Sequence, residues 1–591
     1  MIIGPVFTAR VGAALAPDSL GMQSVNMALY RSVFPGINNT VRYIRVYSAL
    51  CWMVSRIDFV ALERGATGAE AREIAIRGMQ KMELLLSWAN VLHGIKGMPG
   101  RLRVWPTKDE EDNKEVDLRF DVVVSAEQQK LVGNPDVTIK AGAHFMTAPE
   151  YRPSAVNGLC FLVAHPSEPG IWALTPAGLE LARAFQAMLD ETGHELTAWL
   201  ADPTDVRTTR AKVRSLWNPV LNVRECTDAE GHAFLAQYFP PPGHTPKHAP
   251  NWEHRSAGIT LVLRAIRAAE SHFSGNNHFV PVDVIRHVMG SRRTPNGVVL
   301  DDEPFLESAG YWTSLQYRQY IKLALETFLR ITEFELHDAV LTDSARDIPA
   351  VADAIGEWVA KELAGVDAAV DDTIERLTLQ CLPEEPMLYR SGMETDNLNM
   401  AGRVEKLYET ARSVWATPGE REDDARMLAQ AASALAYEAL VYCAVDAPLW
   451  MEVPDFKASI EGDRLSPAEL ARLVEDYRDS PLAQFVAHIV KEYVVNLHFR
   501  VVRERTEEDR NPRDRYRIVM GDEGLERDLH HQRELASVEI LEDRLHRALN
   551  LLARAGIVEQ RGALGDEDEF RLTEEGRQRL EQYSGLEEVV R

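Results

Sequence analysis

The sequence has few cysteines and no closely spaced pair of them. Its five cysteines, Cys51, Cys160, Cys226, Cys381 and Cys443, are scattered over 591 residues, and none forms a CxxC pair. A structural zinc site needs paired ligands, and a disulfide framework is typical of short secreted chains. We therefore expect free thiols in a reducing compartment and a cytoplasmic protein.

Positive charge is also scarce. The chain has 65 Lys and Arg against 90 Asp and Glu, a formal net charge of −25. An acidic surface repels nucleic acid over most of its area, so any contact with DNA would have to be local. No apolar run reaches the about 18 residues of a membrane span. The apolar start of the chain is interrupted by Pro5 and Arg10, unlike a signal peptide. We expect no membrane association.

The linear motifs of common enzyme classes are missing. The sequence contains no GxxxxGK[ST], GxSxG or HExxH pattern. The spacing of His272, His278 and His287 does not place two of them on one helical face. We therefore expect no catalytic site, no metal and no cofactor. Because distant residues can form a site that leaves no linear trace, a cryptic metal-dependent nuclease using scattered carboxylates stays open as an alternative.

The length and the residue pattern predict several helical domains. A chain of 591 residues exceeds one hydrophobic core, and 45% hydrophobic with 26% charged residues is ordinary for a globular protein. Amphipathic periodicity dominates, so we expect a mainly α, multi-domain protein with small β wings. The predicted parts are a helical domain at 1–110, a mixed α/β segment with a wing-like hairpin and helix at 111–238, a Pro-rich linker at 239–254, helical domains at 255–415 and 425–510, and a winged-helix domain at 511–591.

The end of the chain has the pattern of a winged helix. Leucines with helical spacing are followed by Gly556, which ends a helix, and by Ile557 and Val558, which begin a strand. A turn rich in acidic residues leads to a second strand, and Thr573 caps the next helix. A similar strand, turn, strand and helix pattern occurs at 159–176, where Thr175 is the cap.

These two segments carry a family resemblance. LLARAGIVEQRG and FRLTEEGRQRL resemble the recognition helix and wing of MarR- and PadR-like winged-helix domains, and IWALTPAGLELARAF resembles the wing and following helix. The resemblance implies a winged helix, whose reader helix would direct Arg544, Arg547 and Arg554 at nucleic acid. Against DNA contact, the wing tip GDEDE is acidic. Because winged helices also dock proteins, protein docking and self-assembly stay open.

A basic run just before this module is the other candidate nucleic-acid site. Its candidate phosphate ligands are all arginines: Arg503, Arg505, Arg510, Arg513, Arg515 and Arg517. The alternative is an exposed helix and loop, in which these arginines pair with the acidic residues Glu504, Glu507, Glu508 and Asp509.

A second resemblance points to a biological setting. FPGINNTVRYIRVYSALCW together with HFRVVRERTEEDRNPRDRYRIVMGDEGLE is similar to uncharacterised bacterial proteins of anti-phage defence islands, of the Druantia-like accessory type. The resemblance implies partners encoded by neighbouring genes, namely an ATPase, helicase or nuclease. We expect a non-catalytic component of a defence or DNA-maintenance complex that docks proteins, with direct DNA contact and homo-oligomerisation open. The alternatives are the cryptic nuclease and a winged-helix transcription regulator.

Overall fold

The computed structural model describes most of the chain. The described residues are 18–99, 112–120, 144–146, 150–166, 171–300, 306–342, 344–364, 372–382, 385–389, 400–415, 422–449, 464–506, 516–528, 535–540, 544–562 and 568–590. Within these residues the protein is mainly helical with four small antiparallel sheets, which confirms the predicted mainly α character.

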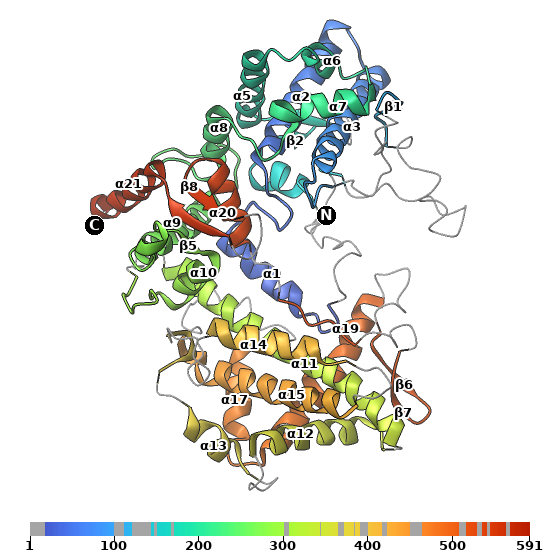
Figure 1. The fold of residues 1–591 in the computed structure, drawn as a ribbon, viewed down its shortest axis with the longest axis vertical. Helices are drawn as coiled ribbons and strands as arrows, with labels where there is room; N and C mark the ends of the chain where they lie inside the picture. The colour runs from blue at the N-terminus through green and yellow to red at the C-terminus, as the bar shows by residue number, and fades with distance from the viewer. Residues whose placement is uncertain are drawn as a thin grey trace. The chain divides into compact units, whose positions relative to one another are not determined.

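The chain divides into two compact units that are interleaved in sequence (Figure 1). Unit 1 comprises Met1–Gly12, Phe34–Val282 and Asp543–Arg591, and unit 2 comprises Ala13–Val33 and Asp283–Glu542. The predicted domains were consecutive stretches, whereas each unit contains segments from distant parts of the chain. The Pro-rich stretch 239–254 lies within unit 1, where the Phe239 ring stacks on Tyr583 at 4.8 Å.

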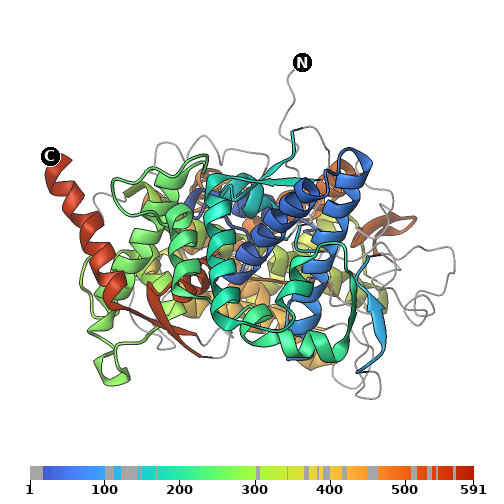
Figure 2. The ribbon, with the colours of Figure 1, turned by 90° about the horizontal axis from the view of Figure 1, so that it is seen from above.

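The first part of unit 1 is built around α2 (Ile44–Glu63). Every residue from Ile44 to Val54 is buried, in agreement with its apolar pattern on all sides. This helix packs against α3 (Ala69–Leu92) and α5 (Pro176–Thr192) (Figure 2). The other helices are α6 (Thr197–Ala201), α7 (Arg210–Leu216), α8 (Asp228–Tyr238) and α9 (Trp252–Glu270), with short turns η2 (Pro153–Gly158), η3 (Trp217–Leu221) and η4 (Ser274–Asn276). The strands here are β1 (Glu115–Asp117) paired with β4 (Arg207–Thr209), and β2 (Leu162–Ala164) paired with β3 (Trp172–Leu174).

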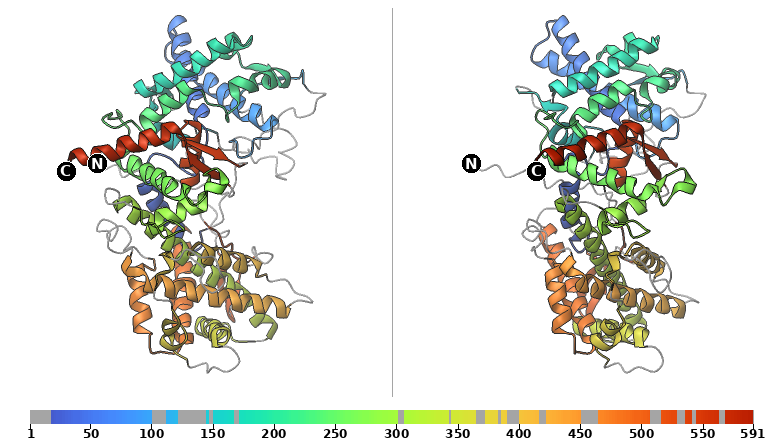
Figure 3. Two further views of the ribbon diagram at one scale, coloured as in Figure 1. Left: turned by 60° about the vertical axis from the view of Figure 1, so that its left-hand side comes forward. Right: turned by 90° about the vertical axis from the view of Figure 1, so that its left-hand side faces the viewer.

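The C-terminal segment completes unit 1. It contains α20 (Leu545–Arg554), β8 (Val558–Arg561), β9 (Glu569–Leu572) and α21 (Glu574–Val590). The strand β9 lies between β8 and β5 (Val280–Pro281), so a strand from the middle of the chain joins the C-terminal hairpin. The helix α21 lies beside α9 (Figure 3). At the end of α9, the Glu270 carboxylate accepts hydrogen bonds from the Leu572 amide at 2.9 Å and from the Arg577 guanidinium at 2.7 Å.

Unit 2 is a helical bundle around the long helix α11 (Leu306–Thr342), which packs against α1, α12, α14 and α15. Its helices are α1 (Met22–Val33), α10 (Val282–Ser291, of which Val282 belongs to unit 1), α12 (Ile348–Ala364), α13 (Ile374–Leu377), α14 (Met400–Ser413), α15 (Glu422–Val445), α17 (Pro467–Asp476), α18 (Leu482–Ile489) and α19 (Asn496–Thr506), with η7 (Leu379–Cys381), η8 (Met387–Tyr389), η9 (Ala447–Leu449) and η10 (Val490–Val495). A hairpin joins β6 (Ile518–Gly521) and β7 (Gly524–Arg527).

One helical stretch of unit 2 has the length and apolar composition of a membrane span. In this stretch, Asp424–Val445 of α15, the apolar window is 61% buried inside the structure. A core helix of a bundle has the same two properties, and α15 packs against α11, α12, α14 and α17.

Candidate docking and nucleic-acid interface

The C-terminal hairpin is held to its following helix by a threonine corner. The Thr573 amide donates to the Ile557 carbonyl at 3.2 Å, and the Thr573 hydroxyl lies 2.6 Å from the Gly556 carbonyl oxygen. The same hydroxyl accepts the Gly576 amide at 3.0 Å, which satisfies a free donor of the first turn of α21. A Cβ on Gly576 would lie 2.1 Å from the Ile557 carbonyl oxygen, so only glycine allows this close approach.

The same corner occurs between β3 and α5. The Thr175 amide donates to the Phe161 carbonyl at 3.1 Å, and its hydroxyl lies 2.7 Å from the Cys160 carbonyl oxygen. The hydroxyl accepts the Gly178 amide at 3.1 Å, and a Cβ on Gly178 would lie 2.0 Å from the Phe161 oxygen. The two hairpin–helix elements are therefore built alike, bond for bond. The sequence predicted both caps but not the packing role of the glycines.

The candidate arginines of α20 are turned toward unit 1 itself. Arg544 and Arg547 are 7% and 3% exposed. An Arg544 Nη1–H donates to the Phe34 carbonyl at 3.4 Å, and the Arg547 Nε–H donates to the Asn39 carbonyl at 2.8 Å. These guanidinium groups therefore hold the start of the segment that leads into α2 rather than lying on an open helix face.

Arg554, at the end of α20, is bound in the same manner. It donates to the Arg224 carbonyl, and its guanidinium carbon lies 5.4 Å from the centre of the Tyr43 ring. Burial lowers the pKa of Arg554, which indicates a desolvated cation. All three candidates of α20 thus share one protein-facing role.

The six arginines of the basic run are not gathered into one described patch. Arg503 is exposed on α19, and Arg505 belongs to the same helix. Arg517 is buried, and its guanidinium forms two hydrogen bonds of 2.6 and 2.9 Å with the Glu333 carboxylate. The remaining candidates lie outside the described residues: Arg510, Arg513 and Arg515.

The wing carries arginines that pair with carboxylates of the same hairpin. Arg561 is bonded to Glu569, and the Arg571 Nε–H donates to Glu559 at 2.7 Å. Both guanidinium groups lie over the Phe279 ring, at 4.6 and 4.7 Å from its centre. Of the acidic wing tip, residues 563–567 lie outside the described part. On the described part of the hairpin, both arginines are therefore paired with carboxylates and lie over one aromatic ring.

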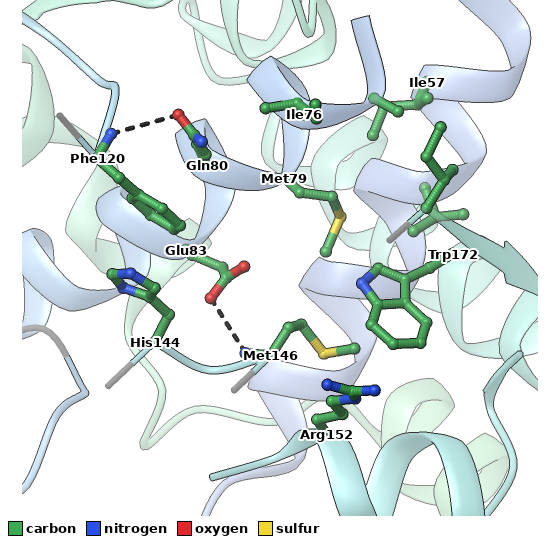
Figure 4. Close-up of a pocket in the computed structure, with 13 residues that line it drawn as sticks. Ile57, Ile76, Met79, Gln80, Glu83, Phe120, His144, Met146, Arg152 and Trp172 are labelled. Atoms are coloured by element: carbon green, nitrogen blue, oxygen red, sulfur yellow. Dashed lines mark hydrogen bonds between the residues drawn. The ribbon is translucent and has the colours of Figure 1, made fainter. Parts of the chain in front are cut away.

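An apolar cavity of about 320 Å³ lies in unit 1 between α2, α3 and β3 (Figure 4). Met79, Met146 and Trp172 line it, and the Arg152 guanidinium lies 5.2 Å from the Trp172 ring. The Glu83 carboxylate in its wall accepts the Met146 amide at 3.1 Å. The cavity is suited to an apolar group beside a cation, and the sequence did not predict it.

Asp117, Asp121 and Lys140 are the residues that could serve a metal-dependent nuclease. Asp117 pairs with Arg119 at 3.2 Å, while Asp121 and Lys140 lie outside the described residues. Burial lowers the pKa of His287 to about 4, so this histidine is neutral. All five cysteines are free thiols. In the part of the chain that the structure describes, no three His, Cys, Asp or Glu side chains are grouped to hold a metal ion.

Comparison of the chain with protein-family models, with curated proteins and with solved structures found no match in any of the three.

Proposed function

We propose that this protein is a non-catalytic component of a bacterial defence or DNA-maintenance complex and that its winged-helix modules dock protein rather than read DNA. One observation carries the proposal: the helix in the position of a DNA reader, α20, directs Arg544, Arg547 and Arg554 at main-chain carbonyls of its own unit. A reader helix needs free donors for base edges and phosphates. Here those donors bind protein.

The order of the elements supports the winged-helix interpretation. Within unit 1 the chain order α9, β5, α20, β8, β9 gives a helix, a strand, a helix and two strands, an order that a winged helix contains. The sheet order β5-β9-β8, in which the first strand pairs with the third, agrees with it. In this interpretation residues 283–542, which belong to unit 2, are an insertion between β5 and α20. The module is therefore assembled from segments that lie far apart in the sequence.

The repeated threonine corner supports a second module. Thr175 and Gly178 at the start of α5 reproduce the bonds of Thr573 and Gly576 at the start of α21. The described residues of these two similar modules form no basic face. Such modules are better suited to protein assembly than to reading a DNA sequence. Partners encoded by neighbouring genes, an ATPase, helicase or nuclease, are the proposed occupants of such an assembly.

Co-purification tests the proposal. The tagged full-length chain should elute with the product of at least one adjacent gene when the locus is expressed together. Alone, it should not degrade DNA with Mg²⁺ or Mn²⁺. Elution without any neighbour, or DNA degradation that EDTA abolishes, would contradict it, and the second result would favour the nuclease alternative.

DNA binding is tested separately with a charge-reversal pair. Arg503→Glu changes the exposed arginine of the basic run, and Arg183→Glu changes an exposed arginine of α5 as a matched control. We expect weak DNA binding that is the same for both variants and the unaltered chain. Tight binding with a steep salt dependence that only Arg503→Glu abolishes would show direct DNA contact, and tight binding to the protein's own promoter would favour a regulator.

A further inference from the structure

The helix α11 carries a row of charged side chains inside unit 2. Lys322, Glu326, Arg330 and Glu333 follow one another at helical spacing and therefore lie along one side of the helix. Lys322 is 2% exposed and Glu333 is fully buried. We refer to these four side chains as the α11 row. Buried charges at this density need partners, because desolvation is costly for each of them.

Their common partner is the segment 535–540, which forms neither helix nor strand. The Glu333 carboxylate accepts the Ala536 amide, and an Arg330 Nη1–H donates to the Ala536 carbonyl at 2.7 Å. Three residues further on, the Glu326 carboxylate accepts the Glu539 amide at 3.2 Å, and Lys322 donates to the Glu539 carbonyl at 2.7 Å. The four side chains thus satisfy both main-chain groups of Ala536 and of Glu539.

Besides its backbone, the segment contributes three buried apolar side chains. Leu535, Ala536 and Val538 are buried, whereas Ser537 and Glu539 are exposed and Ile540 is 44% exposed. Main-chain hydrogen bonds give affinity for a peptide, and pockets for its apolar side chains give specificity. The α11 row therefore recognises a main chain with a small residue at the place of Ala536 and an apolar residue two positions later.

The row is organised independently of the segment. The Arg517 guanidinium holds the Glu333 carboxylate through two hydrogen bonds, and Lys322 bonds to Glu326 at 2.8 Å. Three apolar side chains and a few hydrogen bonds make a small interface, and water can replace the segment's amides when it leaves. Such an interface is suited to exchange. The segment also precedes the point, after Glu542, at which the chain passes from unit 2 into unit 1.

We propose that the α11 row is a peptide-docking site, that residues 535–540 are its resident occupant, and that a segment of a partner protein with the same small–x–apolar pattern displaces them. The site belongs to unit 2, whereas the threonine corners and α20 belong to unit 1, so it adds a partner chemistry to the docking function. Peptide exchange and co-purification with neighbours can each succeed or fail without the other.

The test uses the full-length chain and the labelled, end-capped peptide Leu-Ala-Ser-Val-Glu-Ile. Val538→Asp places a charge where the resident segment buries an apolar side chain, and it should free the site. We expect this variant to bind the peptide at least about tenfold more tightly than the unaltered chain does, because the resident no longer competes. A folded Val538→Asp variant that binds no peptide would overturn the proposal.

Methylation of the peptide backbone tests the recognition mode. A methyl group on the nitrogen equivalent to that of Ala536 removes the donor to Glu333 and should abolish binding. The matched control carries the methyl group on the Val538 nitrogen, which donates to no acceptor among the described residues, and should bind more tightly than the first methylated peptide. Equal binding of the two methylated peptides would contradict recognition through the main chain.

Hydrogen exchange keeps the test informative if Val538→Asp does not fold. In the unaltered chain, excess peptide should accelerate exchange across residues 535–540, because the resident segment is displaced. The peptide methylated at the Ala536 position should leave that exchange unchanged. Unaltered exchange with both peptides would show that the resident is fixed and would overturn the proposal.

Discussion

At the scale of the residue, arginine in this protein mainly ties the chain to itself. Arg45, on α2, donates to both oxygens of Glu230 at 2.7 and 2.8 Å and to the Val220 carbonyl at 2.9 Å. Arg255 caps the end of α8 through the Tyr238 and Gln237 carbonyls at 2.9 and 2.7 Å. A guanidinium group offers five donors in a plane, so one side chain can fix several segments at once.

The buried pair of Arg45 and Glu230 leads to a stability prediction. Glu230→Gln keeps the side-chain shape but leaves the Arg45 cation without its counterion in a site where both side chains are at most 1% exposed. We expect a loss of about 3–5 kcal/mol in the free energy of unfolding of unit 1, measured by urea denaturation. Glu180→Gln, in the exposed pair with Arg183, is the control and should cost less than about 1 kcal/mol. Equal effects of the two variants would show that the buried pair is not a structural tie.

A carboxyl group of the α11 row makes stability depend on pH. Burial raises the pKa of Glu326 from 4.5 to about 7, against the opposing effect of Lys322. The folded chain therefore keeps this proton at pH values where the unfolded chain has released it. The free energy of unfolding consequently falls as pH rises from about 4.5 to about 7 and is constant above, and the shift corresponds to about 3 kcal/mol.

Glu326→Gln should remove that fall. Denaturation curves should be measured between pH 4.5 and pH 8. The free energy of unfolding of the unaltered chain should fall with pH only below about 7, and that of the variant should lack this fall. Glu357→Gln, in an exposed pair with Lys361, should leave the profile unchanged. If the profile of Glu326→Gln ran parallel to that of the unaltered chain, Glu326 would not be the titrating group.

At the scale of the element, the threonine corner predicts the effect of adding one methyl group. Gly178 and Gly576 lie in the first turns of α5 and α21, where alanine would ordinarily favour the helix. A Cβ at either position would instead overlap a main-chain oxygen, at 2.0 or 2.1 Å. We expect Gly178→Ala and Gly576→Ala each to destabilise unit 1 by about 1–3 kcal/mol in thermal or urea unfolding. Gly275→Ala, in open space, should change stability by less than about 0.5 kcal/mol.

Local patterns in the sequence were sufficient to predict both hairpin–helix elements. Thr175 and Thr573 are read from their places between a strand pattern and a helix pattern, and both capping predictions are confirmed. The burial of Arg547 and Arg517 could not be predicted, because it depends on Asn39 and Glu333, which are distant in sequence. From the sequence alone, an arginine on an exposed helix cannot be distinguished from one that is buried against a distant segment.

The pairing of β5 with β9 shows the limit of such patterns. A strand of two residues, Val280–Pro281, has no periodicity of its own, so only its partner defines it. The docking site on α11 was equally hidden. Its charged residues have the spacing of an exposed helix face, and the segment that covers them, 535–540, has no regular structure.

At the scale of the whole molecule, the arrangement within unit 1 differs from a row of consecutive domains. Residues 511–591 were predicted to form one C-terminal domain, but the part from Asp543 onward belongs to the same unit as Phe34–Val282. The segment supplies two of the three strands of the β5-β9-β8 sheet, and α20 binds the carbonyls of Phe34 and Asn39. Removing it would therefore expose a lone strand and the buried approach to α2.

A chain cut after Glu542 tests this arrangement. If residues 543–591 were an independent appendage, their removal would leave the rest unchanged. Because they complete unit 1, we expect the shortened chain to unfold at a lower temperature and to exchange amide hydrogens faster around residues 34–43 and 280–281. Residues 543–591 expressed as a separate chain should bind the shortened protein and restore slow exchange, and Arg547→Ala in that fragment should weaken the rescue, since Arg547 holds Asn39. Gln578→Ala, at an exposed residue of α21 whose side chain bonds to Glu574 within the fragment, is the matched control and should rescue fully. An unchanged melting temperature and unchanged exchange in the shortened chain would show that the C-terminal segment folds as a separate domain.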